Sequence, residues 1–199
     1  RPNLFVGEFS VAGQSLRFIG KRVMTIIDIH GAVKEEYEYA IGSAKDKDML
    51  RCLDKFEKIG VDRASFMICQ SEEMKRYLLY KYPYIDESII YVYHCYADTN
   101  HFCYDKTYRS IIRKELNIGE DETVFLYSGG LHKWQKVDES LKLFEKYYDN
   151  YTKGYFIILT FDADSAVKMV NADFHDIHDR VIVRSVSHDI VPMYLNTAD

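Results

Sequence analysis

The sequence predicts an α/β protein built on parallel sheets that helices cover on both faces. Six short stretches rich in β-branched and aromatic residues alternate with segments of helical periodicity along the 199 residues. Most of these stretches are continuously apolar, as strands are when both faces of a parallel sheet are buried. Alternating strands and helices of this kind are typical of a doubly wound sheet.

The elements can be placed in order. Strands are predicted at 23–29, 65–69, 89–93, 123–128, 155–160 and 181–186. Helices are predicted at 46–59, 72–81 and 106–117. Two further helices should begin near Lys34 and near Val137, and a short one should contain Tyr194. Ser71 has the position of an N-cap, with Glu72 and Glu73 in the first turn. In 46–59 the apolar face carries Met49, Leu53 and Phe56.

The polar, aromatic segment 94–105 interrupts this alternation. We therefore predict two α/β domains, 1–93 and 106–199, joined by a linker at 94–105. The chain begins without a methionine and stops at "YLNTAD", where an amphipathic helix would lead into a further strand. We expect it to be an internal piece of a longer protein, with the start of the first domain and the end of the second missing.

Composition excludes some classes of function. A net charge of −5 without a basic block argues against a nucleic-acid partner. No apolar run approaches the roughly 20 residues of a membrane span, and no signal peptide is visible. The four cysteines form no CxxC pair, which favours reduced thiols in a cytoplasmic protein. A metal site made of His94, Cys95, His101 and Cys103 would have unusual spacing, and we expect none.

Two residues at the end of the first predicted strand are candidates for catalysis. Asp28 and His30 precede Gly31 in "IIDIHGAVKEE", and side chains at the carboxyl ends of parallel strands face the ligand cleft. Histidine can donate, accept or transfer a proton near neutral pH. The alternative is structural, with Asp28 as a cap and His30 satisfied by neighbours.

The stretch "YSGGLHKWQK", 127–136, joins a predicted strand to a helix. Gly129 and Gly130 allow close approach of the backbone, and N–H groups at a helix start attract phosphate. Lys133 and Lys136 add positive charge. The stretch contains no Walker motif and no G-x-G-x-x-G fingerprint, so a plain turn is the alternative interpretation.

In this order, three stretches resemble the family 4 (group 1) glycosyltransferases of the GT-B fold: "DIHGAVKEE", "YSGGLHKWQK" and "VSHDIVPMYLNTAD". "ICQSEEMKRYL" is similar to a strand and serine-capped helix of the same family. The resemblance covers nearly the whole chain. It implies two Rossmann-type domains and a retaining transfer of sugar from a nucleotide-sugar donor to a saccharide or lipid-linked acceptor, in cell-surface polysaccharide or glycoconjugate assembly.

The resemblance also implies roles for single residues. His30 would face the transferred sugar and acceptor, with Asp28 beside it. Gly129 and Gly130 would approach the donor diphosphate, Lys136 would neutralise it, and the backbone near Val186 would contact the nucleobase. No metal or other cofactor is implied. A lipid-linked acceptor would bring the protein to the cytoplasmic face of a membrane, although no polybasic amphipathic helix is visible.

The sequence departs from the family in two places. Many members have arginine at the position of Gly130, a charge that Lys133 could replace, and glycine at the position of Val137. The E-x7-E segment that holds the donor sugar in the family would lie beyond Asp199. Two alternatives therefore stay open: a sugar-nucleotide epimerase of the same fold, and a non-catalytic nucleotide-binding or scaffold protein.

Overall fold

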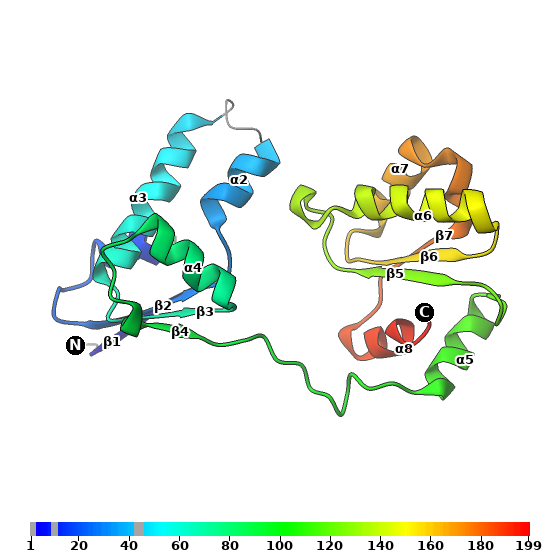
Figure 1. Cartoon of the computed structure of the whole chain (residues 1–199), viewed down its shortest axis with the longest axis horizontal. Coiled ribbons are helices and arrows are strands. Elements are labelled where there is room, and N and C mark those ends of the chain that lie inside the picture. The colour runs from blue at the N-terminus through cyan, green and yellow to red at the C-terminus, as the bar shows by residue number, and fades with distance from the viewer. Residues whose placement is uncertain (1–2, 9–11, 42–45) are drawn as a thin grey trace. The chain divides into compact units, whose positions relative to one another are not determined.

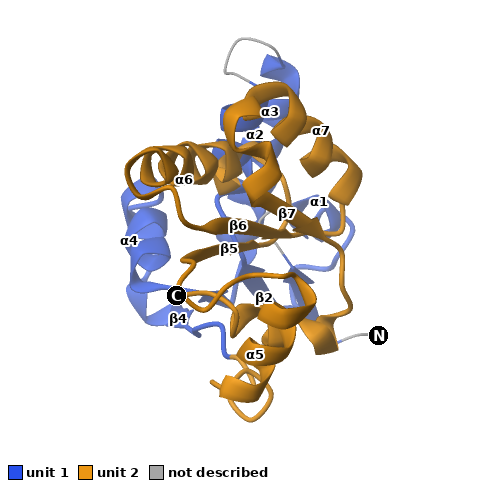
Figure 2. Ribbon diagram, turned by 90° about the vertical axis from the view of Figure 1, so that its right-hand side faces the viewer, with its two compact units in different colours: residues 1–96 blue, residues 97–199 orange. Residues whose placement is uncertain are grey.

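The computed structural model describes residues 3–8, 12–41 and 46–199. Within them the chain forms two compact units, Arg1–Tyr96 and Ala97–Asp199 (Figure 2). The boundary falls inside the segment 94–105 for which we predicted a linker. No helix of the described part is both long enough and apolar enough to cross a membrane.

Unit 1 contains a four-stranded parallel sheet of order β1-β2-β3-β4. Its elements are β1 (Leu4–Glu8), α1 (Gly13–Leu16), β2 (Met24–Ile29), α2 (Val33–Ile41), α3 (Lys47–Arg63), β3 (Phe66–Cys69), α4 (Glu72–Lys81) and β4 (Ile90–Val92). Strands β2, β3 and β4 and helices α2, α3 and α4 confirm predicted elements, whereas β1 and α1 were not predicted. Ser71 caps α4, since its hydroxyl accepts the N–H of Met74 at 3.1 Å.

The described helices of unit 1 cover one face of its sheet (Figure 1). The core on that face joins side chains of the strands, such as Ile27 and Met67, to Leu16 of α1, Val61 of α3 and Leu78 of α4. A sequential strand order with right-handed crossovers places connecting helices on a single face. The strand register places the alternate residues together on the other face of the sheet. Four of these residues are each about half exposed: Leu4, Val6, Met24 and Tyr91.

The buried face of α3 differs from the apolar face that the sequence predicted. Leu50 and Val61 are buried, while Met49 is 44% exposed. The carboxylate of Glu57 also lies in the buried face, where it accepts a hydrogen bond from Tyr82 and pairs with Lys81 at 2.5 Å. This buried ion pair allows an acidic residue where the sequence pattern indicated an apolar face.

Unit 2 contains a three-stranded parallel sheet of order β5-β6-β7. Its elements are α5 (Lys106–Glu115), β5 (Val124–Ser128), α6 (Val137–Tyr151), β6 (Tyr155–Leu159), α7 (Ala163–Asp173), β7 (Val181–Arg184) and α8 (Val191–Leu195), with 3-10 helices at Lys133–Gln135, His175–Arg180 and His188–Ile190. The three strands and α5, α6 and α8 confirm predicted elements; α7 was not predicted.

Helices cover both faces of the sheet of unit 2 (Figure 1), as predicted for continuously apolar strands. Phe156 and Ile158 of β6 pack with α6 and α7, while Ile157 and Leu159 pack with α5 and α8. All four side chains are buried. The central strand thus has no solvent-facing side, which is why its sequence does not alternate.

Candidate functional site

A pocket of about 400 Å³ opens at the carboxyl ends of the strands of unit 2. Ser128 ends β5 and Leu159 ends β6, and the residues that follow them form the pocket wall. The lining consists of Phe102, Ser128, Gly129, Gly130, Leu159, Thr160, Phe161, Val186, His188, Val191 and Leu195. The pocket thus brings together three residues predicted for donor binding: Gly129, Gly130 and Val186.

Gly129 lets the chain turn tightly after β5. Its φ is 159°, and its N–H donates to the carbonyl oxygen of Leu159 at 3.0 Å. A Cβ atom at this position would lie 2.7 Å from the hydroxyl oxygen of Tyr127. Glycine therefore lets the turn take this path without displacing the Tyr127 hydroxyl, and it leaves the backbone open to the pocket.

Tyr127 holds the same turn in place. Its hydroxyl oxygen lies 2.6 Å from the carbonyl oxygen of Gly130 and 3.1 Å from Oε1 of Gln135. Burial raises the pKa of Tyr127, so its proton stays available for donation. The sequence reasoning missed this residue, although a tyrosine that ends an apolar run just before two glycines was a usable signal.

The two predicted lysines lie after the turn. Neither Lys133 nor Lys136 is among the residues that line the pocket. Lys136 stands at the N-terminal end of α6 in the left-handed conformation, with φ 58° and ψ 36°, and its Nζ contacts Oε1 of Glu139 at 2.5 Å. Beside them the rings of His132 and Trp134 stack with centroids 4.5 Å apart.

Asn196 joins α8 to the chain segment that enters unit 2. Its side-chain oxygen accepts the N–H of Asp105 at 2.7 Å, and its amide nitrogen donates to the carbonyl of Cys103 at 3.0 Å. Residues 103–105 are thereby fixed against the helix that carries Leu195. These bonds hold the neighbouring Phe102 at the pocket wall.

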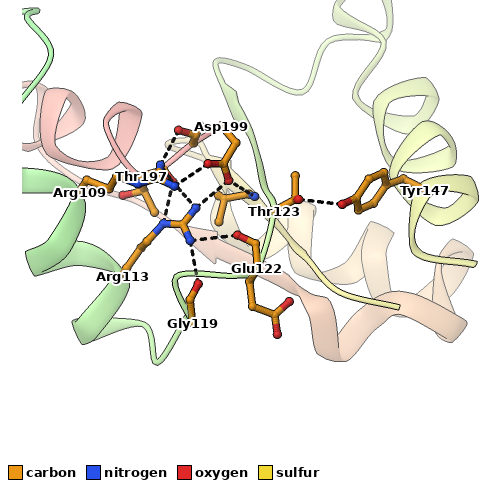
Figure 3. Close-up of polar contacts among 10 residues, drawn as sticks. Arg109, Arg113, Gly119, Glu122, Thr123, Tyr147, Thr197 and Asp199 are labelled. Carbon is orange, nitrogen blue, oxygen red and sulfur yellow. Dashed lines mark hydrogen bonds and ion pairs between the residues drawn. The ribbon is translucent and has the colours of Figure 1, made fainter. Parts of the chain in front are cut away.

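A buried guanidinium fixes the end of α8 to the start of β5 (Figure 3). Arg113, which is 1% exposed, donates to the carbonyl oxygens of Gly119, Glu122 and Thr197 and pairs with Asp199 at 2.7 Å. Oδ2 of Asp199 also accepts the N–H of Val124 at 2.8 Å.

These contacts set the ionisation of Asp199. Burial opposes the charged form, but the hydrogen bond from the backbone and the nearby Arg109 and Arg113 outweigh it and lower the pKa of Asp199. The carboxylate is therefore charged where it meets Arg113 and the first residue of β5. This ionic connection holds the segment after α8 against the start of β5.

Unit 1 has its own pocket, of about 360 Å³, at the carboxyl ends of β2, β3 and β4. It is lined by Asp28, His30, Ile68, Gln70, Tyr93, His94, Cys95 and Tyr96. Both residues that the sequence indicated for catalysis are thus part of one cavity. Gln70, Tyr93 and Tyr96 were not predicted for it.

The ring of His30 has a polar contact at each nitrogen. The side-chain amide of Gln70 lies 2.8 Å from Nδ1 of His30. Nε2 of His30 lies 3.3 Å from Oδ2 of Asp28. The arrangement is a carboxylate–imidazole pair at the end of a strand, a group that can orient a hydroxyl or move a proton.

No protein-family model matches the chain, and no curated protein matches it in sequence. It does resemble solved structures. HepE of Anabaena in complex with UDP-glucose matches with a TM-score of 0.73 and 15% identity, over 99% of this chain and 51% of that one. TarM matches with a TM-score of 0.62 and 9% identity, over 98% of this chain and 34% of that one.

MnaA of S. aureus in complex with UDP matches with a TM-score of 0.54 and 12% identity, over 98% of this chain and 50% of that one. The chain spans about half the length of HepE and MnaA, and about a third of TarM. Identities this low show likeness of fold alone. With a parallel α/β sheet in each of its two units, the chain has the GT-B fold.

Proposed function

We propose that the chain is part of a retaining glycosyltransferase that moves a sugar from a nucleotide-sugar donor to a saccharide or lipid-linked acceptor. The observation that carries this proposal is the pocket of unit 2, in which a glycine turn, the end of β6 and Val186 meet. Ligands of open α/β sheets bind at this end of the strands. HepE, which has the same fold, was crystallised with UDP-glucose, so a UDP-linked sugar is the first donor to test.

The two pockets support a division of roles between the units. The turn at Gly129 and Gly130 would approach the diphosphate, and Lys136 or Lys133 would neutralise charge that develops on it as the bond to the sugar breaks. Preorganised donors and cations stabilise such charge without reorganisation. The pair His30–Asp28 in the pocket of unit 1 would face the sugar and the acceptor. This chemistry needs no metal ion.

Calorimetry with UDP and UDP-glucose tests the proposal directly. We expect a dissociation constant between about 1 µM and 1 mM, the usual range for enzyme substrates. Leu195→Trp should abolish binding because Leu195 lines the pocket. Leu143→Trp is the matched control, since Leu143 is an exposed leucine of α6 that does not line it. Equal binding by both variants would place the nucleotide elsewhere, and no binding of any nucleotide sugar would favour the scaffold interpretation.

A nucleotide-sugar epimerase is the second candidate, because MnaA and UDP-N-acetylglucosamine 2-epimerases share the fold. The two activities differ in their need for an acceptor. An epimerase changes the sugar of UDP-N-acetylglucosamine with no acceptor present, which proton NMR detects. A transferase releases UDP at a rate that depends on the acceptor.

A further inference from the structure

A second group of polar side chains adjoins the pocket in unit 2 through His188, which lines it. The imidazoles of His101 and His188 and the carboxylate of Asp189 each offer a ligand atom, and these atoms all lie within 4.8 Å of one another. This set differs from the four residues considered from the sequence. Of those, His94 and Cys95 belong to unit 1, while His101 and Cys103 belong to unit 2.

Aromatic packing brings the rings of His101 and His188 together. The rings of His101 and His188 are 6.0 Å apart and inclined by 24°, and the ring of Phe102 meets both edge-on at 5.0 and 5.4 Å. The N–H of Phe102 donates to the carbonyl of Asp98 at 2.8 Å. His188 and Asp189 begin a 3-10 helix that leads directly into α8. The group is therefore built from two segments that are both packed against the body of unit 2.

One atom of this group lacks a partner. Nε2 of His101 is buried, yet it forms no hydrogen bond with any residue that the structure describes. A buried polar atom without a partner costs free energy. A ligand that reaches this nitrogen would satisfy it.

We propose that His101, His188 and Asp189 bind a divalent transition-metal ion such as Zn²⁺ or Co²⁺. Two imidazole nitrogens and one carboxylate oxygen suit these ions better than Mg²⁺ or Ca²⁺, which prefer oxygen ligands. Zinc sites with three protein ligands keep a further position for water or another ligand. The ligand atoms must draw closer than 4.8 Å to share one ion, and the side chains of His188 and Asp189 that would have to move are exposed.

The site has a consequence for the pocket because His188 lines it. A bound cation would place positive charge at the pocket wall and favour an anionic ligand there, and by linkage the ligand would favour the cation equally. This consequence rests on the proposed function. The metal site itself does not.

Titration of the full chain with Co²⁺ alone tests the site, followed by visible absorption, with Zn²⁺ as the competitor. The wild-type protein should show the intense absorption of a four- or five-coordinate Co²⁺ that Zn²⁺ displaces. His188→Ala and Asp189→Asn should each lower the affinity at least about tenfold, since even residues that only support a metal ligand change affinity by about 10- to 100-fold. Circular dichroism confirms that both variants fold.

The chain offers a matched control. His175 and His178 also stack, at 5.1 Å, and Nε2 of His178 lies 3.1 Å from Asp179, but these three residues do not form a convergent set of ligand atoms. His178→Ala should bind Co²⁺ like the wild type. Absence of the absorption band, or equal affinities of the His188 and His178 variants, would overturn the proposal. Co²⁺ binding without UDP binding would support the metal site and count against the proposed function instead.

Discussion

The variant Lys136→Gly distinguishes two possible roles of Lys136. In one, its charge acts on a bound ligand; in the other, the residue only begins helix α6. Lys136 adopts a left-handed conformation at φ 58°, which costs a residue with a Cβ about 1–2 kcal/mol relative to glycine. Such strained residues cluster at functional sites. Glycine would relieve the strain but remove the charge.

The expected change in stability is small. Relief of strain, about 1.5 kcal/mol, is offset by about 0.7 kcal/mol for the greater freedom of glycine in the unfolded chain. The pair of Lys136 with Glu139 is an exposed contact three residues apart on a helix, worth about 0.3 kcal/mol. The free energy of unfolding of Lys136→Gly should therefore rise by about 0.5 kcal/mol.

Activity should change far more, and in the opposite direction. Loss of one group that stabilises a developing charge costs about 3 kcal/mol, or roughly a hundredfold in turnover. Urea unfolding and sugar-transfer kinetics on the same samples measure both quantities. Thr152→Gly is the matched control, because Thr152 ends α6 with φ 52°: it should gain similar stability with unchanged turnover.

Two results would refute this reasoning about Lys136. Near-normal turnover in Lys136→Gly would show that the side chain does not act on the diphosphate. A loss of more than about 1 kcal/mol of stability would show that the lysine is kept for structure.

Three further predictions follow from other contacts. Gly130→Arg should tighten UDP binding about tenfold in calorimetry, because a charged hydrogen bond contributes about 1.5 kcal/mol or more. A Cβ at Gly130 has room, since it meets only the flexible end of Gln135 at 3.0 Å and the ring of His132 at 3.3 Å. Unchanged affinity would place the phosphates elsewhere. His30→Ala should lower turnover about a hundredfold but leave UDP affinity unchanged, since His30 belongs to unit 1; weaker UDP binding would contradict this. The folded-state pKa of Asp199 is lowered, so its contribution to stability is present above the unfolded pKa of about 3.9 and is lost as the pH falls through the lower folded value. The free energy of unfolding, measured in urea at pH 6 and at pH 3, should therefore fall less between these pH values for Asp199→Asn than for the wild type.

The continuous apolar strands were predictable because burial on both faces leaves a direct mark on sequence. Strand β6 is the clearest example, since all of Phe156–Leu159 is buried. Strand β1 left no such mark: Val6 is half exposed, and Gly7 and Glu8 weaken the pattern. The helix α7 was missed since the residues that it buries, Ala166 and Val170, are few and small.

The candidate site was predictable only where the backbone dictates the residue. The turn at Gly129 favours glycine, and the end of a strand defines the place of His30. Phe102 and Leu195, in contrast, reach the pocket through tertiary contacts between segments far apart in sequence. Arg113 lies in a helix whose pattern placed Ile112 inside, and its own burial depends on carbonyl groups that no local pattern reveals.

The unequal cover of the two sheets bears on how cooperatively the chain melts. Unit 2 has packed cores on both faces of its sheet, whereas the described helices of unit 1 protect one face and leave Leu4, Val6, Met24 and Tyr91 half exposed. Because it buries less apolar surface, we expect unit 1 to melt at the lower temperature. A calorimetric scan of the chain should then resolve two endotherms, and a ligand of the unit 2 pocket would shift the upper one alone.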